Sequence, residues 1–287
     1  MKARDLWQLV RGGNALMAGI GVLAGIVLGF DGPLSTSAWL APLAAILITG
    51  FGNVLNDLGD IAIDRVAHPT RPLPREAVTL RQARALAVVL LVLGLLAAAT
   101  AGLTTFVFAV AVAVLLVWYE AALKATGLPG NLAVALLTGS TFLFGAVAAG
   151  ASSASIIAPA CLAGMAFFAN LGRELLKDLE DARADAGARR TFPMQAGRRA
   201  TFVAVHVACV LGAAVSAPIV VTFWQTLPAG LLLLAADAMV LVAPFLARSD
   251  VRTGQTALKV AMATALLAVA VGLAHSVANG MASSQAC

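Results

Sequence analysis

The sequence predicts an all-α polytopic membrane protein, and three observations lead to this fold class. Of the 287 residues, 61% are apolar and only 11% are charged, against about 25% charged in soluble globular domains. The mean hydropathy is +0.93, and several apolar runs reach the length of about 18 residues that crosses a bilayer. Nearly all charged residues fall between these runs. These features exclude a soluble domain, a disordered chain and a disulfide-linked scaffold.

Apolar segments of helical length follow one another along the chain, separated by charges or by glycine and proline clusters. Each fits a window of about 18 to 23 residues, as a transmembrane helix requires. The first segment runs through glycine-rich positions without a small-residue cleavage site, which favours a membrane helix over a signal peptide. We therefore expect nine transmembrane helices, at residues 14–30, 38–56, 83–99, 103–119, 131–149, 155–174, 200–222, 229–246 and 257–277.

The positive charges indicate how these helices are oriented. All 19 Lys and Arg lie in the N-terminal region or in alternate connections, such as those holding Arg71 and Arg190. Because cytoplasmic loops carry the excess of Lys and Arg, we expect the N-terminus and these loops in the cytoplasm. With nine helices, the C-terminus would lie on the far side. The predicted location is the cell membrane, either plasma or inner, with the bilayer as a partner.

Acidic residues gather in two segments on the predicted cytoplasmic side. The first ends the second predicted helix and contains Asn56, Asp57, Asp60 and Asp64. On a helix, positions 56, 60 and 64 recur at i, i+4 and i+8, so their oxygens share one face. Hard oxygen ligands of this kind suit Mg²⁺, which keeps some water and accepts phosphate oxygens from a substrate.

The second segment ends the sixth predicted helix and repeats this arrangement. Asp178, Asp181 and Asp185 stand at i, i+3 and i+7, and Glu174 extends the same face by one turn. A solvated helix end would explain one such cluster, but repeated carboxylates repel one another unless a cation is bound. Two clusters therefore favour two Mg²⁺ sites that hold one diphosphate. Further positive charge would come from Arg71, Lys124, Arg173 and Lys177.

These motifs resemble the UbiA family of intramembrane aromatic and lipid prenyltransferases. The resemblance is carried by Asn56-Asp57-x-x-Asp60-x-x-x-Asp64, by Pro69-x-Arg71-Pro72-x-Pro74, and by the second acidic segment. It covers essentially the whole chain. It implies a single transmembrane prenyltransferase domain over residues 1–287, with nine helices around a central cavity for a prenyl diphosphate.

The resemblance also implies the chemistry and the residues that perform it. The reaction would be Mg²⁺-dependent transfer of a prenyl group, geranylgeranyl by expectation, with two metal ions. The implied catalytic residues are Asp60, Asp64, Asp181 and Asp185. The implied metal ligands are Asn56, Asp57, Asp60, Asp64, Asp178, Asp181 and Asp185. The donor diphosphate would contact Arg71, Lys124, Arg173 and Lys177, and the acceptor or its loop would contact Arg11, Asn14 and Tyr119.

The acceptor is the least determined part of this interpretation. Arg173-Glu174-x-x-Lys177-Asp178 and the segment from Tyr119 to Asn131 are similar to the lipid branch of the family. The cationic residues exceed what a diphosphate with two Mg²⁺ needs, which favours an anionic acceptor such as geranylgeranylglyceryl phosphate. The alternative is an aromatic acceptor of the quinone, chlorophyll or 4-hydroxybenzoate type. No nucleic acid partner is expected.

Two loops depart from the family pattern. Ala184 precedes Asp185 where glycine is usual, and Arg75-Glu76 follows a proline where the family has glycine.

Two other classes compete with this reading. A transporter with repeated halves would have acids at the bilayer midplane, where only Asp237 lies. We expect Asp237 to have a structural or protonated role. A CDP-alcohol phosphotransferase would need Gly, Ala and Arg after its first aspartate pair, and Asp57-Leu-Gly-Asp60 does not supply them.

Overall fold

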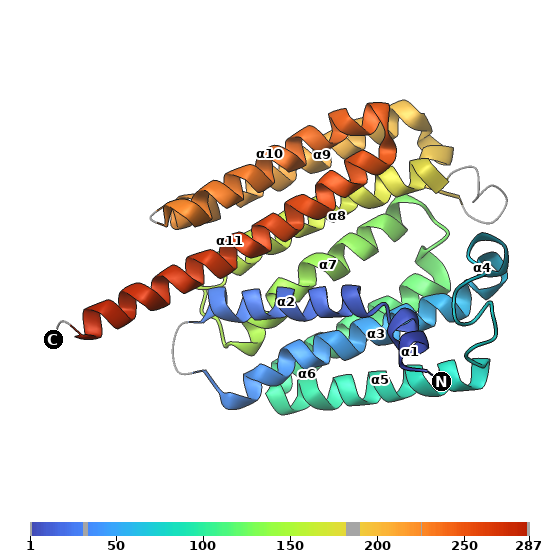
Figure 1. Cartoon of the computed structure of the whole chain (residues 1–287), viewed down its shortest axis with the longest axis horizontal. Helices are drawn as coiled ribbons and strands as arrows, with labels where there is room; N and C mark the ends of the chain where they lie inside the picture. Colours follow the sequence, from blue (N-terminus) through green and yellow to red (C-terminus); the bar gives the residue numbers. More distant parts are fainter. Residues whose placement is uncertain (1, 31–33, 182–189, 225, 286–287) are drawn as a thin grey trace. The chain divides into compact units, whose positions relative to one another are not determined.

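The computed structural model describes residues 2–30, 34–181, 190–224 and 226–285, and its regular structure over these ranges is entirely helical (Figure 1). The elements are α1 (Ala3–Leu9), α2 (Gly12–Gly29), the 3₁₀ turn η1 (Thr36–Leu40), α3 (Ala41–Gly59), α4 (Ile61–Ala67), α5 (Leu80–Ala101), α6 (Leu103–Trp118), the π-helical turn η2 (Tyr119–Leu123), α7 (Leu128–Ala148), α8 (Ile157–Asp181), α9 (Phe192–Phe223), α10 (Leu227–Ser249) and α11 (Val251–Gln285). The predicted all-helical class is confirmed.

All nine predicted segments lie in helices, with ends that shift by a few residues. Within the described ranges, eight helices are long and apolar enough to cross a membrane. The sixth predicted segment, in α8, is a full-length helix of 25 residues but carries Asn170, Arg173 and Glu174 in its second half. Asn170 and Glu174 are buried, so these polar groups face protein rather than lipid.

The chain divides into two compact units. Unit 1 comprises Met1–Ala122 and Leu143–Ser152, and unit 2 comprises Leu123–Phe142 and Ser153–Cys287. The first acidic segment belongs wholly to unit 1, and the described part of the second belongs to unit 2. That the units act as one domain over residues 1–287 stays a prediction.

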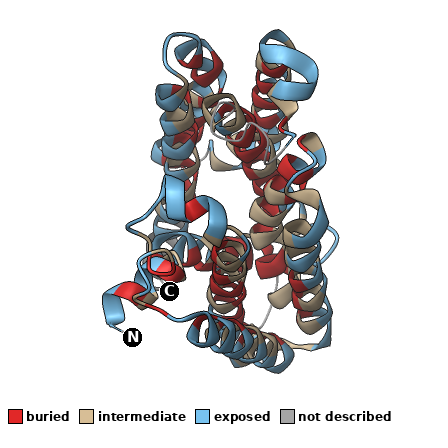
Figure 2. Cartoon of the chain, turned by 90° about the vertical axis from the view of Figure 1, so that its right-hand side faces the viewer, coloured by how far each residue is buried: buried red, intermediate tan, exposed pale blue. Residues whose placement is uncertain are grey.

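Unit 1 is built on close contact between α2, α3, α5 and α6 and the end of α7. Its core includes Val22, Ile26, Ile48 and Phe144, and burial follows the inner faces of the helices (Figure 2). Gly145 allows the closest approach, because a Cβ at this position would lie 2.1 Å from the carbonyl oxygen of Val22.

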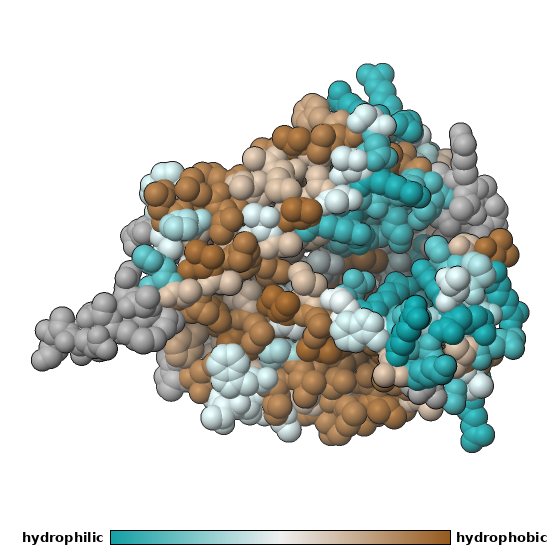
Figure 3. All heavy atoms as spheres, in the orientation of Figure 1, coloured by the Kyte–Doolittle hydropathy of each residue, from teal (hydrophilic) through white to brown (hydrophobic). Residues whose placement is uncertain are grey.

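Unit 2 consists of most of α7 and of α8, α9, α10 and α11. Its fully buried side chains include Met165, Leu176, Ile219 and Leu258. Large apolar residues on the outer flanks remain exposed, as expected where helices meet lipid tails. Figure 3 shows, within each unit, hydrophobic side chains along the flanks and hydrophilic side chains gathered at the helix ends. The chain is therefore an integral membrane protein by its helices and its surface.

Candidate active site

The first acidic segment lies where α3 gives way to α4. Asp60 has φ −91° and ψ 4°, so α3 ends at Gly59 and α4 begins at Ile61. The backbone N–H of Asp60 still donates to the carbonyl of Asn56 at 2.9 Å, and that of Asp64 donates to the carbonyl of Asp60 at 2.8 Å. The predicted spacing of these three residues therefore persists through a break that the spacing alone did not indicate.

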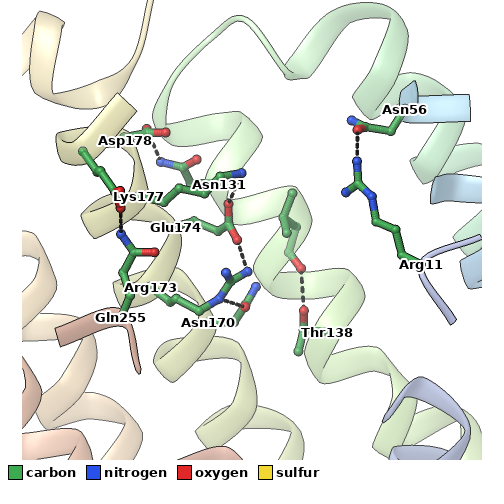
Figure 4. A network of polar contacts seen from close by, with 12 residues as sticks. Arg11, Asn56, Asn131, Thr138, Asn170, Arg173, Glu174, Lys177, Asp178 and Gln255 are labelled. Atoms are coloured by element: carbon green, nitrogen blue, oxygen red, sulfur yellow. Dashed lines mark hydrogen bonds and ion pairs between the residues drawn. The ribbon is translucent and has the colours of Figure 1, made fainter. Parts of the chain in front are cut away.

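Two carboxylates of this segment are buried, and arginines neutralise both. Asp57 and Asp64 are each 3% exposed. Arg11 Nη2 donates to Asp57 Oδ1 at 2.7 Å. The same nitrogen donates to Asn56 Oδ1 at 2.9 Å (Figure 4). Arg71 Nη1 donates to Asp64 Oδ2 at 2.6 Å and lies 3.9 Å from Asp57 Oδ1. Since a buried carboxylate is costly unless a cation is beside it, these residues form one charge-balanced cluster.

Arg11 is held in this cluster by an uncommon backbone conformation. It precedes the first residue of α2 with φ 47°, in the left-handed region, which few non-glycine residues adopt. Asn53 Nδ2 donates to the carbonyl of the preceding Val10 at 2.8 Å and ties the start of α2 to α3. Asn14, another predicted contact residue, is exposed in the first turn of α2, and its side chain makes no hydrogen bond to the described residues.

Glu120 also belongs to this cluster, although the sequence pattern did not indicate it. Asn56 Nδ2 donates to Glu120 Oε2 at 3.2 Å. A Cβ at Gly59 would lie 2.1 Å from Glu120 Oε1, so the carboxylate occupies the space beside this glycine. Glu120 lies in the π-helical turn Tyr119–Leu123, a conformation frequent at functional sites. The available signal was an acid directly after the only tyrosine, inside the segment that resembles the lipid branch.

The loop that carries Arg71 is fixed at both ends. Arg75 pairs with the carboxylate of Asp5, which is buried at 4% exposure. The backbone N–H of Arg75 donates to the carbonyl of Arg71 at 3.1 Å. Glu76 then adopts φ 59°, the left-handed conformation that glycine would take without strain. The missing family glycine therefore coincides with a position whose backbone favours glycine.

The second acidic segment is described as far as Asp181, the last residue of α8. Asp178 Oδ2 accepts a hydrogen bond from Asn131 Nδ2 at 2.9 Å (Figure 4). Asn131 lies in the first turn of α7, so this bond joins the start of α7 to the end of α8. Asp185 lies outside the described residues.

The two predicted diphosphate cations on α8 contact a carboxylate of their own helix. Glu174 is 8% exposed and pairs with Arg173, while Lys177 Nζ lies 3.9 Å from Glu174 Oε2. Arg173 Nε donates to Asn170 Oδ1 at 3.1 Å (Figure 4). The other side-chain atom of Asn170, Nδ2, is buried and has no hydrogen-bond partner among the described residues. This network therefore orients the Nδ2 donor of Asn170 and the cations of Arg173 and Lys177 in the second half of α8.

Further hydrogen bonds anchor the loop that follows Lys124, the remaining predicted cation, and the end of α8. The loop after Lys124 is bound to the start of α9, because Arg190 N donates to Ala125 O at 3.3 Å and Gln195 Nε2 donates to Thr126 O at 3.2 Å. Glu180 accepts from Gln255 Nε2 at 2.8 Å and from Arg252 Nε at 2.5 Å, which joins α8 to α11.

The acidic residues of unit 1 suit a hard cation by chemistry, although their carboxylates do not converge as a ready-made metal cluster. Within the described ranges, no three side chains of His, Cys, Asp or Glu come together for a metal. In unit 1, Asn56, Asp57 and Asp64 supply oxygen donors, and Arg11 and Arg71 balance the charge. Oxygen donors of this kind are those that Mg²⁺ selects.

The model of the UbiA prenyltransferase family matches residues 18–267. The chain belongs to the UbiA prenyltransferase family. It is therefore a membrane-embedded prenyltransferase. Family membership agrees with the motif from Asn56 to Asp64 on which the resemblance was based.

Several relatives within the UbiA family are similar over most of their length. The digeranylgeranylglyceryl phosphate synthase of Methanoculleus marisnigri is 39% identical over 236 residues, covering 81% of each chain. That of Methanopyrus kandleri is 37% identical over 275 residues, covering 92% of this chain and 97% of the relative.

Solved structures agree with this UbiA membership. One, from a study of a digeranylgeranylglyceryl phosphate synthase in membranes, has a TM-score of 0.74 at 27% identity and covers 94% of this chain and 98% of that one. A UbiA homologue from Archaeoglobus fulgidus bound to GPP and Mg²⁺ has a TM-score of 0.71 at 17% identity, with 94% and 98% covered, and shares the fold.

Proposed function

We propose that this prenyltransferase transfers a geranylgeranyl group from its diphosphate to geranylgeranylglyceryl phosphate, which gives digeranylgeranylglyceryl phosphate, an ether lipid. The observation that carries the proposal is the 37% identity to the Methanopyrus kandleri synthase, over 97% of that protein. A likeness of this extent covers the segments around both acidic clusters, including those that bear on the acceptor.

Two Mg²⁺ ions are the proposed cofactors. Asn56, Asp57, Asp60 and Asp64 would hold one in unit 1, and Asp178, Asp181 and Asp185 would hold the other in unit 2. Support comes from the oxygen donors that Asn56, Asp57 and Asp64 supply within unit 1, which are of the kind that Mg²⁺ selects. The Mg²⁺ and GPP in the Archaeoglobus fulgidus homologue also support the proposal. When bound, Mg²⁺ neutralises a diphosphate and makes it a better leaving group.

The arginines of the clusters would be available to bind or position the substrate once metal ions neutralise the carboxylates. Arg71 would move from Asp64 to a phosphate oxygen, because the single contact of its Nη1 with the Asp64 carboxylate would be replaced by a bidentate contact with phosphate. Arg11 would stay beside Asn56 and Asp57 and fix their orientation. On α8, Glu174 would keep the side chains of Arg173 and Lys177 close together. A bound diphosphate would then replace Glu174 as the anion that these two cations contact.

The transfer itself exchanges one C–O bond for another. The allylic C–O bond of the donor breaks, and its electron pair leaves with the diphosphate. The hydroxyl oxygen of the acceptor forms the new ether bond to that carbon and releases its proton. The isoprenoid tails would lie among apolar helices, since exposure to water costs about 0.8 kcal/mol per CH₂.

The proposed orientation places the N-terminus and the acidic segments at the cytoplasmic face of the cell membrane. The alternation of Lys and Arg between connections supports it.

The deciding experiment offers purified protein, Mg²⁺ and geranylgeranyl diphosphate with three acceptors in separate reactions. These acceptors are geranylgeranylglyceryl phosphate, its dephosphorylated alcohol and 4-hydroxybenzoate, and mass spectrometry detects the products. We expect rapid prenylation of the phosphate. The alcohol should react about 10 to 100 times more slowly, because each lost charge-assisted bond is worth about 1.5 to 3 kcal/mol.

Two outcomes would contradict the assignment. Equal turnover of the phosphate and the alcohol would show that the phosphate is not recognised. Prenylation of 4-hydroxybenzoate alone would favour the aromatic branch. The Asp60→Asn variant serves as the control and should form almost no product. If it forms product at the native rate, that product comes from a source other than this site.

A further inference from the structure

A groove on unit 2 is lined by none of the residues assigned to prenyl transfer. It has a volume of about 690 Å³ and is lined by one face of α9 and by the end of α10. The α9 residues that line it are Arg198, Arg199, Phe202, Val203, His206 and Val207. They recur at intervals of four, so two parallel rows run down the same side of the helix.

One end of the groove is strongly basic. Arg198 and Arg199 begin the two rows on α9, and Arg248 enters from the last turn of α10. All three side chains are exposed, and none is paired with a carboxylate in the part of the chain that the structure describes. Three uncompensated guanidinium groups around one groove attract an anion, and their planar forks suit a phosphate.

Aromatic rings position two of these arginines. The Cζ atom of Arg198 lies 5.2 Å from the ring centroid of Phe202, and that of Arg248 lies 5.3 Å from the ring of Phe245. Stacking on a ring face restrains the guanidinium while its N–H groups at the edge stay available. The entropic cost of ordering these side chains around a ligand is therefore partly removed.

The rest of the groove is apolar and runs along membrane-crossing helices. Val203 and Val207 are 57% and 53% exposed, on a helix long and apolar enough to cross the bilayer. His206 packs edge-on against Phe245 with ring centroids 5.1 Å apart, and its Nδ1 donates to the carbonyl of Phe202 at 2.6 Å. Arg198 and His206 are eight residues apart, so the apolar part extends about 12 Å from the basic end.

We propose that this groove binds an anionic phospholipid of the surrounding membrane. The phosphate lies among Arg198, Arg199 and Arg248, and one hydrocarbon chain follows the row through Val203 and Val207. A free phosphate would use the arginines alone and would leave the apolar rows unexplained. Basic pockets between helices on the cytoplasmic side are typical sites for anionic headgroups.

The test measures lipid binding to the delipidated, full-length protein in detergent by native mass spectrometry. The probes are dioleoylphosphatidylglycerol and dioleoylphosphatidylcholine, which differ in headgroup charge. We expect the anionic lipid to bind about 10- to 100-fold more tightly to the native protein, and Arg198→Gln/Arg199→Gln/Arg248→Gln to lose this preference. A matched control, Arg65→Gln/Arg81→Gln/Arg84→Gln, removes the same amount of positive charge from unit 1. This control should keep the preference for the anionic lipid.

A second pair of variants tests the apolar part without changing charge. Val207→Trp fills the groove with an indole ring and should lower affinity for the anionic lipid about tenfold. Val210→Trp places the same ring on an equally exposed position of α9 that does not line the groove, and should bind normally. Neither change buries or empties core volume, so both variants should fold.

Four results would overturn the proposal. The first is equal binding of the two lipids by the native protein. The second is equal loss of binding in the unit 1 control. The third is displacement of the lipid by inorganic phosphate, which would indicate a simple anion site. The fourth is displacement by geranylgeranylglyceryl phosphate at a concentration far below that of the phospholipid, since such a preference would make the groove an acceptor site.

Discussion

Arg71 Nη1 donates to the buried carboxylate of Asp64 at 2.6 Å, across a separation of seven residues in the sequence. The same nitrogen lies 3.9 Å from Asp57 Oδ1. A single guanidinium thus neutralises one buried carboxylate and approaches a second. A metal ion bound to these oxygens, as proposed, would take over a role that Arg71 already performs, so the two cations would compete for the same anions.

This competition leads to a prediction about Arg71→Gln. Without Mg²⁺ the variant should be less stable by about 1 to 3 kcal/mol, less than for a fully buried pair because a third of the Arg71 side chain is exposed. Addition of Mg²⁺ should raise its Tm more than that of the native protein, by about 2 to 4 °C per kcal/mol of repulsion relieved. Thermal unfolding with EDTA and with Mg²⁺ measures both effects.

The exposed Arg81 on α5 provides the control for that measurement. Arg81→Gln removes one positive charge outside the cluster and should respond to Mg²⁺ as the native protein does. An identical Mg²⁺ response in the Arg71 and Arg81 variants would contradict a metal site at Asp57 and Asp64.

Loss of a proposed metal ligand should abolish activity without unfolding the protein. Asp60 is at a helix break and Asp181 at a helix end, so Asp60→Ala and Asp181→Ala open no core cavity. Each should lower the rate of product formation at least about 100-fold, or about 2.7 kcal/mol. Product formation is followed by mass spectrometry, and folding by gel filtration in detergent. Substantial activity in both variants would rule out the two-metal arrangement.

Glu76→Gly should stabilise the protein. Residue 76 has φ 59°, which costs a non-glycine residue about 1 to 2 kcal/mol, whereas glycine adds about 0.5 to 1 kcal/mol of unfolded-state entropy. The net gain is expected to lie between about 0 and 1.5 kcal/mol and is read as a rise in Tm. Glu76→Ala removes the same carboxylate but keeps the backbone strain. If the alanine variant gains as much as the glycine variant, charge rather than backbone conformation is responsible.

Cysteine labelling tests the proposed orientation. Cys161 and Cys209 are buried, so Cys287→Ser provides a background with little labelling. On that background, Glu76→Cys should react with an impermeant reagent only from the cytoplasmic side, and Ser153→Cys only from the far side. Both side chains are exposed. The nine-helix prediction places their two connections on opposite sides of the membrane. Labelling of both from the same side would contradict the nine-helix topology.

The helices could be predicted because a bilayer imposes a minimum apolar length on each one. The predicted segments 14–30 and 229–246, for example, differ from α2 and α10 by only a few residues at each end. The acidic segments could be recognised for a related reason, since carboxylates repeated on one helical face repel one another unless positive charge lies beside them.

The partners of those acids could not be predicted, because they come from distant parts of the chain. Arg11 is separated from Asp57 by 46 residues, and Asn131 from Asp178 by 47. The pairing of Glu174 with Arg173 and Lys177 depends on which rotamers the packing of α8 selects, which helical spacing does not determine. The break at Asp60 was missed because hydrogen bonds across it preserve the regular spacing.

The contact between Gly59 and Glu120 restricts how this protein can change over evolution. Any side chain at position 59 would overlap the Glu120 carboxylate, whose Oε1 lies 2.1 Å from where a Cβ would stand. The two positions should therefore vary together, and relatives with a larger residue at 59 should have a shorter one at 120. Without such a change, a side chain at position 59 would turn the flexible Glu120 side chain away and disturb its hydrogen bond from Asn56 Nδ2, so the glycine preserves this contact.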